Sequence, residues 1–237
     1  MINPMPIRIL VIGDSLANGT NEYNRVEEYE YYLTGDANPN TLFEWDGVQL
    51  VEIEKDIITA NKGSQYPSMA NKLKELTGRP THLVETALGG TGFARVRSDN
   101  WTSTGNMYAP MLIKANDYLA SQNVAKFDII KLIGGTNDVN SSATEVEIEE
   151  DINDLIVRLH ADFPDTKIVY SNVRNTSSKF IAVRGFIQNI IDTDTLVFSG
   201  ADLVDYSSEP LANGLHLMQY GNEVFGEEDA GIINVLL

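Results

Sequence analysis

The sequence predicts an α/β protein, a three-layer α/β/α sandwich with a central parallel sheet of about five strands. Short and nearly continuous apolar runs recur along the chain, as in strands that are buried on both faces. Segments with apolar residues at helical spacing separate these runs, and this alternation favours a parallel sheet with right-handed crossovers. The chain has 237 residues, of which 43% are hydrophobic, and we expect one domain over residues 1–237.

The first predicted strand, Ile7 to Ile12, is β-branched and aliphatic and ends at a glycine. Four later runs have the same character: Thr81 to Ala87, Phe127 to Ile133, Lys167 to Tyr170 and Thr195 to Phe198. Each is short enough for a strand and is flanked by glycine, proline or polar residues. Together they supply the five expected strands.

Helices are predicted between the strands, with capping signals at several ends. The clearest one follows Thr144, because Thr144 and Glu147 form a Thr-x-x-Glu capping box before an apolar stripe. The acidic side chains of this helix are interpreted as a solvated face rather than as metal ligands. The other predicted helices are Tyr66 to Leu76, Pro110 to Gln122, Ser177 to Ile191 and a final one within Tyr220 to Leu237.

An aromatic-rich insertion is predicted at about residues 21–65, since this connection is far longer than is usual between a strand and a helix. Asp46-Gly47 indicates a hairpin between Leu42 to Trp45 and Val48 to Ile53. The aromatic residues of the insertion either line a sugar or acyl site beside Ser15 or form a small satellite core. They are Tyr23, Tyr29, Tyr31, Tyr32, Phe43 and Trp45.

The composition argues against several classes of partner. Lys and Arg total 17 against 34 Asp and Glu, and a net charge of −17 repels phosphate backbones and anionic lipid. We therefore expect no nucleic-acid partner and no membrane partner. The chain has no cysteine, no long apolar segment and no secretion signal at its start, so a soluble protein is expected, with its compartment and oligomeric state open.

Polar and glycine residues follow the predicted strands at the places where ligands bind in open parallel sheets. Ser15 follows the first strand within Gly13-Asp14-Ser15-Leu16, and His216 lies near the C-terminus. Two glycine segments follow the intervening strands: Gly89-Gly90-Thr91-Gly92 and Gly134-Gly135-Thr136-Asn137-Asp138. Of the other histidines, His82 begins a predicted strand and His160 ends the acidic helix, so both are interpreted as structural.

These four blocks, in this order over residues 13–217, resemble the SGNH (GDSL) hydrolases, and the Gly-Gly-Thr form is similar to their carbohydrate O-acetylesterase branch. The resemblance implies the flavodoxin-like SGNH-hydrolase fold and an esterase that needs no metal or cofactor. It further implies that Ser15 is the nucleophile and His216 the general base. The oxyanion donors would be the Ser15 N–H, the Asn137 amide and the N–H of Gly90, with Gly92 as the alternative.

Substrate contacts are expected at four further positions around this loop: Asp14, Thr91, Gly92 and Arg95. Arg97 is a further candidate for substrate contact, although an arginine that is only solvated would look the same in the sequence. Asp14 is also expected to bind backbone groups of its own turn. The family usually has an asparagine five residues before the oxyanion glycine, where this chain has Glu85 or Ala87.

One departure from the family affects the chemistry directly. Three residues before His216 the family usually has an aspartate, and this chain has Asn213. Three explanations remain open: a Ser15–His216 dyad with Asn213 as a neutral orienting group, a replacement acid among Asp202, Asp205 and Glu209, or a pocket that binds without catalysis. The asparagine could also have been introduced deliberately.

The leading functional hypothesis is a serine esterase that hydrolyses a carbohydrate or small-molecule ester, most specifically by removing O-acetyl groups from a carbohydrate. The alternatives are a noncatalytic carbohydrate-binding or structural module on the same fold, and a lipase-like or thioesterase-like acyl hydrolase. Nucleotide binding is disfavoured, because the chain lacks Gly-x-x-x-x-Gly-Lys-Ser/Thr, and Gly90-Thr91-Gly92 lacks the third glycine of a dinucleotide site. An ordinary α/β-hydrolase elbow, Gly-x-Ser-x-Gly, is also missing.

Overall fold

The structure is a computed structural model that describes residues 4–18, 37–53, 64–173, 178–206, 212–213, 216–217 and 219–237. For residues 212, 213, 216, 219 and 220 it describes the backbone only. Within these residues, every helix is too short or too polar to cross a lipid bilayer.

The centre of the molecule is a seven-stranded sheet with the order β3-β2-β4-β1-β5-β6-β7. All neighbouring strands are parallel except β2 and β3, which form an antiparallel hairpin. The expectation of about five strands was therefore too low, because this hairpin joins the sheet beside β4. The strands are β1 (Ile7–Gly13), β2 (Leu42–Trp45), β3 (Leu50–Glu52), β4 (Thr81–Glu85), β5 (Ile129–Ile133), β6 (Lys167–Ser171) and β7 (Val197–Ser199).

The five predicted strands have the flavodoxin-like order, in which the first strand lies between the second and third. The chain leaves β1 toward β4 on one side and later continues through β5 on the other. The direction of winding thus reverses between β1 and β5. In open α/β sheets this is where a crevice opens outside the carboxyl ends of the strands, so this topology favours a ligand site beside Gly13 and Ile133.

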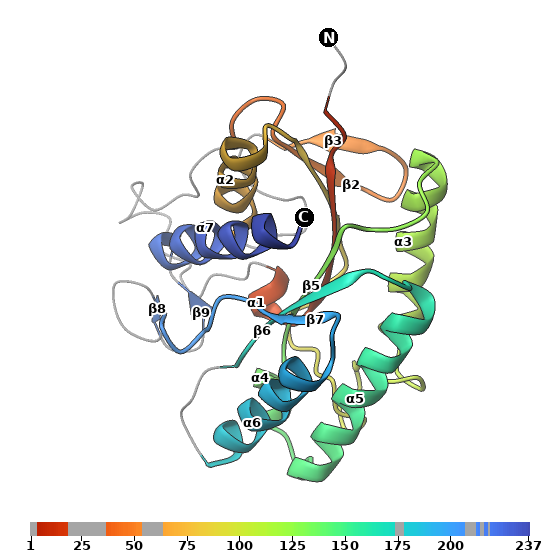
Figure 1. Ribbon diagram of the computed structural model, residues 1–237. Coiled ribbons are helices and arrows are strands. Elements are labelled where there is room, and N and C mark those ends of the chain that lie inside the picture. Colours follow the sequence, from red (N-terminus) through yellow and green to blue (C-terminus); the bar gives the residue numbers. More distant parts are fainter. Residues whose placement is uncertain are drawn as a thin grey trace, which may run out of the picture.

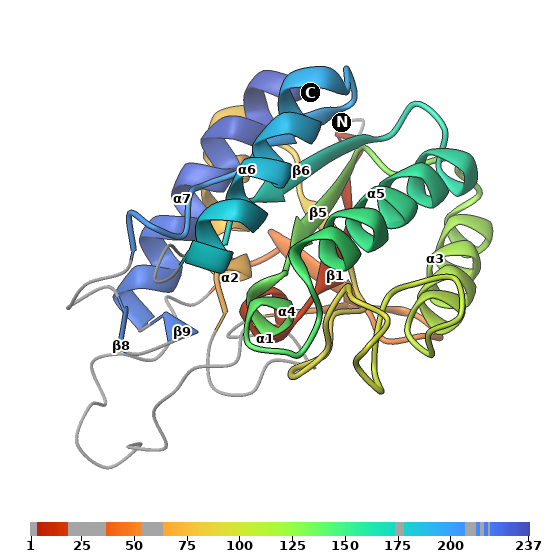
Figure 2. The ribbon, with the colours of Figure 1, turned by 90° about the horizontal axis from the view of Figure 1, so that it is seen from below.

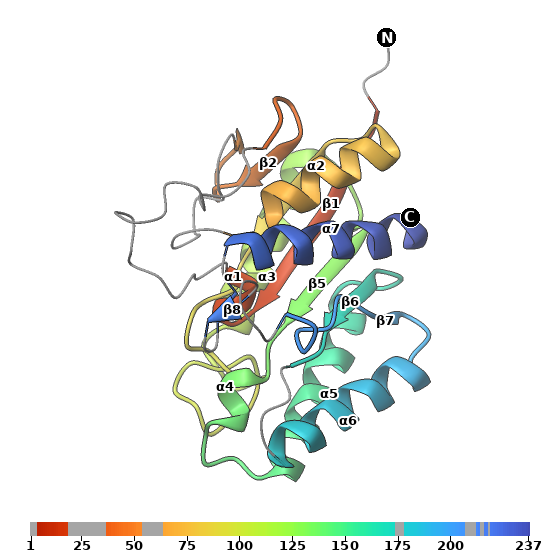
Figure 3. The same cartoon turned by 90° about the vertical axis from the view of Figure 1, so that its left-hand side faces the viewer.

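Helices cover both faces of the sheet and complete the three layers (Figures 1 and 3). One face carries α3, α5 and α6, and the other carries α2 and α7, which pack against each other. The helices are α1 (Ser15–Asn18), α2 (Tyr66–Thr77), α3 (Tyr108–Gln122), α4 (Thr136–Val139), α5 (Glu145–Asp162), α6 (Ser178–Thr193) and α7 (Gln219–Leu236).

Strand β1 shows why the apolar runs are continuous. Ile7, Ile9 and Val11 pack into the core under α2 and α7, and Leu10 and Ile12 pack into the core under α3, α5 and α6. All five side chains are fully buried. A strand with a helical layer on each face has no solvated side, so it does not alternate between apolar and polar residues.

The predicted capping box at the start of α5 is present. The Thr144 hydroxyl accepts a hydrogen bond from the Glu147 N–H, and the Glu147 carboxylate accepts one from the Thr144 N–H. These contacts satisfy backbone donors that have no partner within a helix, and they lower the pKa of Glu147. The acidic first turn is therefore used in helix capping.

The predicted hairpin within residues 21–65 is confirmed, with Asp46 Oδ1 accepting from the N–H groups of Val48 and Gln49 in its turn. Trp45 is buried and packs edge-on against Tyr118, while Phe43 contacts His82. Both aromatic residues therefore belong to the sheet, and Trp45 also belongs to its core. The four tyrosines of the insertion lie outside the described residues, and the single-domain expectation stays a prediction.

A buried ion pair joins the sheet to α7. Lys131, on the inner strand β5, lies 2.6 Å from Asp229, and both side chains have zero exposure. Lys131 Nζ also donates to Ser171 Oγ at 2.5 Å, and Asp229 Oδ1 accepts from the Ala201 N–H at 2.9 Å. Burial lowers the pKa of Lys131, and the Asp229 carboxylate opposes this shift.

We predict that Asp229→Asn lowers the free energy of unfolding by roughly 3 kcal/mol, because it leaves the Lys131 ammonium buried without its counter-ion. The double variant Lys131→Met/Asp229→Asn should regain most of this loss, because it removes the charge and keeps the volume of the side chain. Urea unfolding near neutral pH measures both effects. A single variant as stable as the parent protein would contradict the prediction.

Candidate functional site

The serine site begins where β1 ends. Gly13 has φ +148°, and a Cβ atom there would lie 1.7 Å from the carbonyl oxygen of Ile133, so only glycine fits. The next residue, Asp14, donates its N–H to the same Ile133 oxygen at 3.1 Å. Ser15 follows as the first residue of α1 and is 7% exposed. The sequence therefore places this serine directly beside the end of β5.

Asp14 is a buried carboxyl group next to the serine. Its Oδ1 accepts from the Leu16 N–H at 3.0 Å, as the expected turn contact, and its Oδ2 has no hydrogen-bond partner among the described residues. Burial raises the pKa of Asp14 to about 7, a shift that the Leu16 N–H opposes and the Asp138 carboxyl group increases. Asp14 therefore changes its charge near neutral pH.

The loop after β4 contains the two candidate oxyanion glycines, and the structure distinguishes them. The Gly92 N–H donates to the Asp99 carbonyl at 3.2 Å and is therefore engaged within the loop. Gly90 is exposed, and no residue in the described ranges accepts from its N–H. It has φ +83° at the third position of the turn from Leu88 to Thr91, whose N–H donates to the Leu88 carbonyl. This geometry favours Gly90 as the donor.

The loop after β5 forms the other side of the site. It enters α4, where Asn137 is half-buried and Asp138 is fully buried. The two carboxylate oxygens of Asp138 accept from the N–H groups of Phe93 and Ala94, each at 2.8 Å. Burial raises the pKa of Asp138, and these two donors oppose the rise. Asp138 thus fastens the β4 loop to α4.

Thr91 and Asn137 connect the loops to one another. The Asn137 amide donates one hydrogen to the Thr91 carbonyl at 2.9 Å, and an amide nitrogen carries a second hydrogen. The single hydrogen of the Thr91 hydroxyl is shared between the Leu88 and Gly13 carbonyls, at 2.8 and 3.1 Å, and the hydroxyl oxygen accepts from the Trp101 indole at 3.1 Å. Thr91 therefore serves the loop structure, and it connects this loop to Asn137 and to the end of β1, the strand that precedes Ser15.

The histidine comes from a small hairpin at the same end of the molecule. Strands β8 (Ala212–Asn213) and β9 (His216–Leu217) are antiparallel, with Asn213 in direct register with His216. Strand β9 lies against α1 and α7, and Leu217 is buried in the same cluster as Leu16 (Figure 2). Residues about 200 positions apart in the sequence, Ser15 and His216, are thereby placed on adjoining elements.

Two of the three proposed replacement acids lie within the described residues. Both oxygens of Asp202 accept from the Arg184 guanidinium, at 2.8 and 2.6 Å. Although burial acts the other way, Arg184 and the Val204 N–H lower the pKa of Asp202. Asp205 is exposed, and Glu209 lies outside the described residues. Asp202 therefore already has a structural partner.

Arg95 and the two other histidines have structural partners. Arg95 binds Asp151 of α5 with its guanidinium 2.6 Å from the carboxylate, and it reaches Glu150 at 3.4 Å, so its role as a substrate contact stays a prediction. His160 pairs with Asp194 at 2.8 Å, and His82 contacts the Tyr118 hydroxyl at 3.0 Å. Burial, with the nearby Arg8, lowers the pKa of His82 to about 4.

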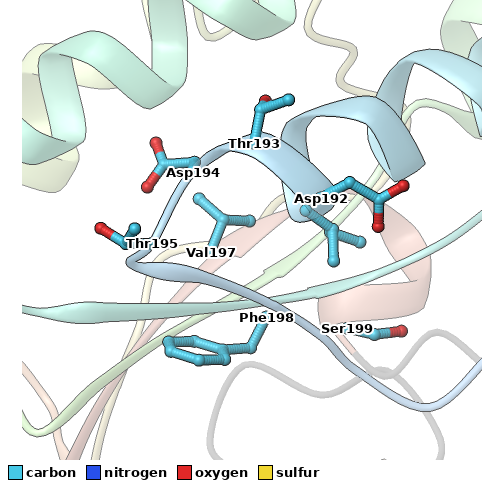
Figure 4. A pocket seen from close by; sticks show the side chains of 8 residues that line it. Asp192, Thr193, Asp194, Thr195, Val197, Phe198 and Ser199 are labelled. Atoms are coloured by element: carbon cyan, nitrogen blue, oxygen red, sulfur yellow. The ribbon is translucent and has the colours of Figure 1, made fainter.

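A surface hollow of about 320 Å³ lies elsewhere, along the outer strand β7 and the turn that precedes it (Figure 4). Its acidic residues are Asp192 and Asp194. In the sheet order β7 is separated from β1 by β5 and β6, so this hollow is distinct from the serine site. Within the described residues, no group of three His, Asp or Glu side chains is placed to hold a metal ion.

We predict that Asp14→Asn changes how stability depends on pH. Between about pH 4 and about pH 7 the native carboxyl group keeps a proton that the unfolded chain has lost, so stability falls as the pH rises through this range. The variant lacks this dependence. As the pH rises from about 5 to about 8, the free energy of unfolding of the variant should increase by on the order of 2 kcal/mol relative to that of the parent protein. Urea unfolding of both proteins measures this, and parallel pH curves would contradict it.

Comparison with known proteins adds independent findings. Residues 9–188 match the sequence profile of the family described as GDSL-like lipase/acylhydrolase. No curated protein sequence matches the chain. Solved structures are similar as well, at identities that show the fold alone, and three of them match along nearly their whole length as follows.

The first is a protein from Arabidopsis thaliana, with TM-score 0.76 and 16% identity over 96% of this chain and 98% of that one. The second is Est24, a carbohydrate acetylesterase from Sinorhizobium meliloti, with TM-score 0.61 and 16% identity over 98% and 100%. The third is an aryl esterase from M. smegmatis, with TM-score 0.60 and 15% identity over 98% and 100%. Because the profile covers most of the chain, the protein belongs to the GDSL-like lipase/acylhydrolase family.

Proposed function

We propose that this protein is a serine ester hydrolase in which Ser15 is the nucleophile and His216 the general base. One observation carries the proposal: the strand that bears His216 packs against the helix that begins with Ser15. Membership of an acylhydrolase family supports the reaction class. That the Ser15 and His216 side chains face each other, as proton transfer requires, is part of the proposal.

The reaction proceeds in two halves. Ser15 Oγ attacks the ester carbonyl carbon and gives its proton to the His216 imidazole. The tetrahedral intermediate collapses, the bond from carbon to the ester oxygen breaks, and the alcohol leaves with the proton from His216. Water then attacks the acyl-serine and gives a proton to His216, which returns it to Ser15 Oγ as the carboxylic acid departs.

The oxyanion of each intermediate needs donors that are in place before the reaction. Gly90 supplies an exposed N–H on a turn that Thr91 fixes. Asn137 supplies the second hydrogen of its amide, since the first one binds the Thr91 carbonyl and thereby orients the group. The Ser15 N–H is the third donor. A single donor of this kind contributes about 3 to 4 kcal/mol in a well-studied protease.

Asn213 serves as a neutral orienting group in this proposal. Its register with His216 suits a hydrogen bond from the imidazole to the amide oxygen. The amide adds no negative charge to stabilise the imidazolium, and an aspartate-to-asparagine change in a serine protease lowers turnover by about 10⁴. We therefore expect slow turnover, which is easiest to detect on activated esters.

The substrate that we propose is an O-acetylated carbohydrate. The similarity to the fold of Est24, which is a carbohydrate acetylesterase, and the Gly-Gly-Thr turn after β4 support this choice. A series of 4-nitrophenyl esters of increasing chain length separates it from a lipase-like activity. Rates that fall steeply beyond acetate are expected, and a preference for long chains would favour the lipase alternative.

We predict that Ser15→Ala abolishes hydrolysis of 4-nitrophenyl acetate, because the nucleophile is removed. Asn213→Asp should raise kcat by roughly tenfold or more, because a carboxylate stabilises the imidazolium. Ser121→Ala, at the end of α3, is the matched control and should keep the parent rate. Steady-state rates are measured on all four proteins after circular dichroism has confirmed their folding.

A Ser15→Ala protein that retains the parent rate would contradict the proposal. If Asn213→Asp also gains nothing, the noncatalytic binding module becomes the better interpretation. Titration with acetylated and free oligosaccharides would then test binding.

A further inference from the structure

Arg97 joins the two loops that carry the proposed oxyanion donors. Its Nη2 donates to the Gly90 carbonyl at 2.6 Å, and its Nη1 donates to the Asn137 carbonyl at 3.2 Å. One planar guanidinium thus spans the loop after β4 and the loop after β5. The two residues that it contacts are the same two whose N–H groups are proposed to bind the oxyanion.

The path of the Arg97 side chain is fixed by its surroundings. A Cβ atom on Gly92 would lie 2.3 Å from Arg97 Cδ and 2.3 Å from Asp138 Oδ1, so glycine at position 92 leaves the space that both side chains occupy. The Arg97 backbone is held as well, because its N–H donates to the Ala94 carbonyl and its carbonyl accepts from Asn100 Nδ2 at 2.7 Å. The guanidinium therefore has a defined position between the loops.

Arg97 also brings a positive charge near two buried acids. It lowers the pKa of both Asp14 and Asp138, against the larger opposite effect of burial. Arg95, two residues away, directs its charge to Asp151 and Glu150 of α5 instead. Of these two arginines, Arg97 alone contacts both donor loops.

Arginine suits this position because its five N–H donors lie in a rigid plane and can bind two carbonyls at once. A catalytic donor that is misplaced by about 1 Å can lower a rate by about a hundredfold. A side chain that fixes the separation of two donors therefore affects the transition state more than the bound substrate, because the negative oxygen forms only during reaction.

We propose that Arg97 is a positioning residue that holds the Gly90 N–H and the Asn137 amide at the separation needed to bind the oxyanion. This inference rests on the proposed function, since it requires an oxyanion on an acyl group attached to Ser15. It assigns Arg97 a role that is separate from substrate contact. Its effect should appear in kcat, with KM nearly unchanged.

The test uses steady-state hydrolysis of 4-nitrophenyl acetate by Arg97→Met, Arg97→Lys and a matched control, Arg79→Met. Arg79 also donates to two main-chain carbonyls, of Met5 and Pro6, at 2.8 and 3.0 Å, but it lies at the amino end of β1. Arg97→Met should lower kcat by about 10- to 100-fold with KM changed less than about threefold. Arg97→Lys should lose about tenfold, because an ammonium group cannot span both carbonyls, and Arg79→Met should keep the parent kcat.

A boronic acid supplies a second readout, because its adduct with a serine hydroxyl is tetrahedral and negatively charged. Its affinity should fall in parallel with kcat/KM in the Arg97 variants, and added guanidinium ion, below the concentration that unfolds the protein, should partly restore the rate of Arg97→Met. A purely structural loss would not be rescued in this way.

The outcomes separate the two proposals. Parent kcat in Arg97→Met, with an inactive Ser15→Ala, overturns the role of Arg97 and leaves the esterase standing. If Arg97→Met does not fold, Arg97→Lys decides, and a parent kcat there overturns the role equally. If Ser15→Ala keeps the parent rate, the esterase proposal fails, and the inference about Arg97 fails with it.

Discussion

The close contact between Gly13 and the carbonyl oxygen of Ile133 is the constraint on which the site depends. A Cβ atom at position 13 would lie 1.7 Å from that oxygen, so β1 and β5 can end side by side only because residue 13 is glycine. Ser15 leaves one strand, and the loop with Asn137 leaves the other. The parallel pairing of β1 with β5 brings both to the point where the winding of the sheet reverses. The proposed nucleophile and the proposed donor Asn137 follow neighbouring strand ends for this reason.

The loops beyond these strands are held by polar contacts rather than by apolar packing alone. Thr91 joins the β4 loop to the end of β1, and Asp138 joins the same loop to α4. Arg97 spans the β4 and β5 loops. Each contact gives a main-chain group a hydrogen-bond partner, and burying such a group without a partner would destabilise the fold. The resulting arrangement is preorganised, which is what oxyanion binding requires.

Two carboxyl groups, Asp14 and Asp138, are buried within electrostatic reach of each other, and burial raises the pKa of both. Arg97 offsets part of this cost. In the proposed mechanism Asn213 adds no further negative charge beside His216. The chemistry then depends more on the oxyanion donors and less on stabilisation of the imidazolium.

Much of this could be predicted from the sequence, and the failures have physical reasons. Continuous apolar runs identified five of the six parallel strands, all except β2, and the capping box located α5, because these signals are local. Ser15 and Asn137 could be expected at one edge because parallel strands end together, whereas His216 lies on β9 of a separate hairpin. That the β2–β3 hairpin pairs with β4 could not be foreseen, because Asp46-Gly47 indicates a turn but no partner strand.

Other features of the site depended on side-chain directions in space. Arg95 and Arg97 look alike in the sequence, yet one binds α5 and the other bridges two loops. Gly90 and Gly92 could be distinguished only by the partner of each N–H. The burial of Asp14 likewise follows from the surrounding loops, and nothing in the order of residues indicates it.

The most direct test of the central claim is to locate the adduct formed with a fluorophosphonate. The folded protein is incubated with the reagent, digested and mapped by mass spectrometry, with the heat-unfolded protein as the control. If Ser15 is an activated nucleophile, the adduct should lie on the peptide that contains Ser15, and only in the folded protein. Folded protein that remains unmodified, or an adduct on another serine, would contradict the claim that Ser15 performs the chemistry.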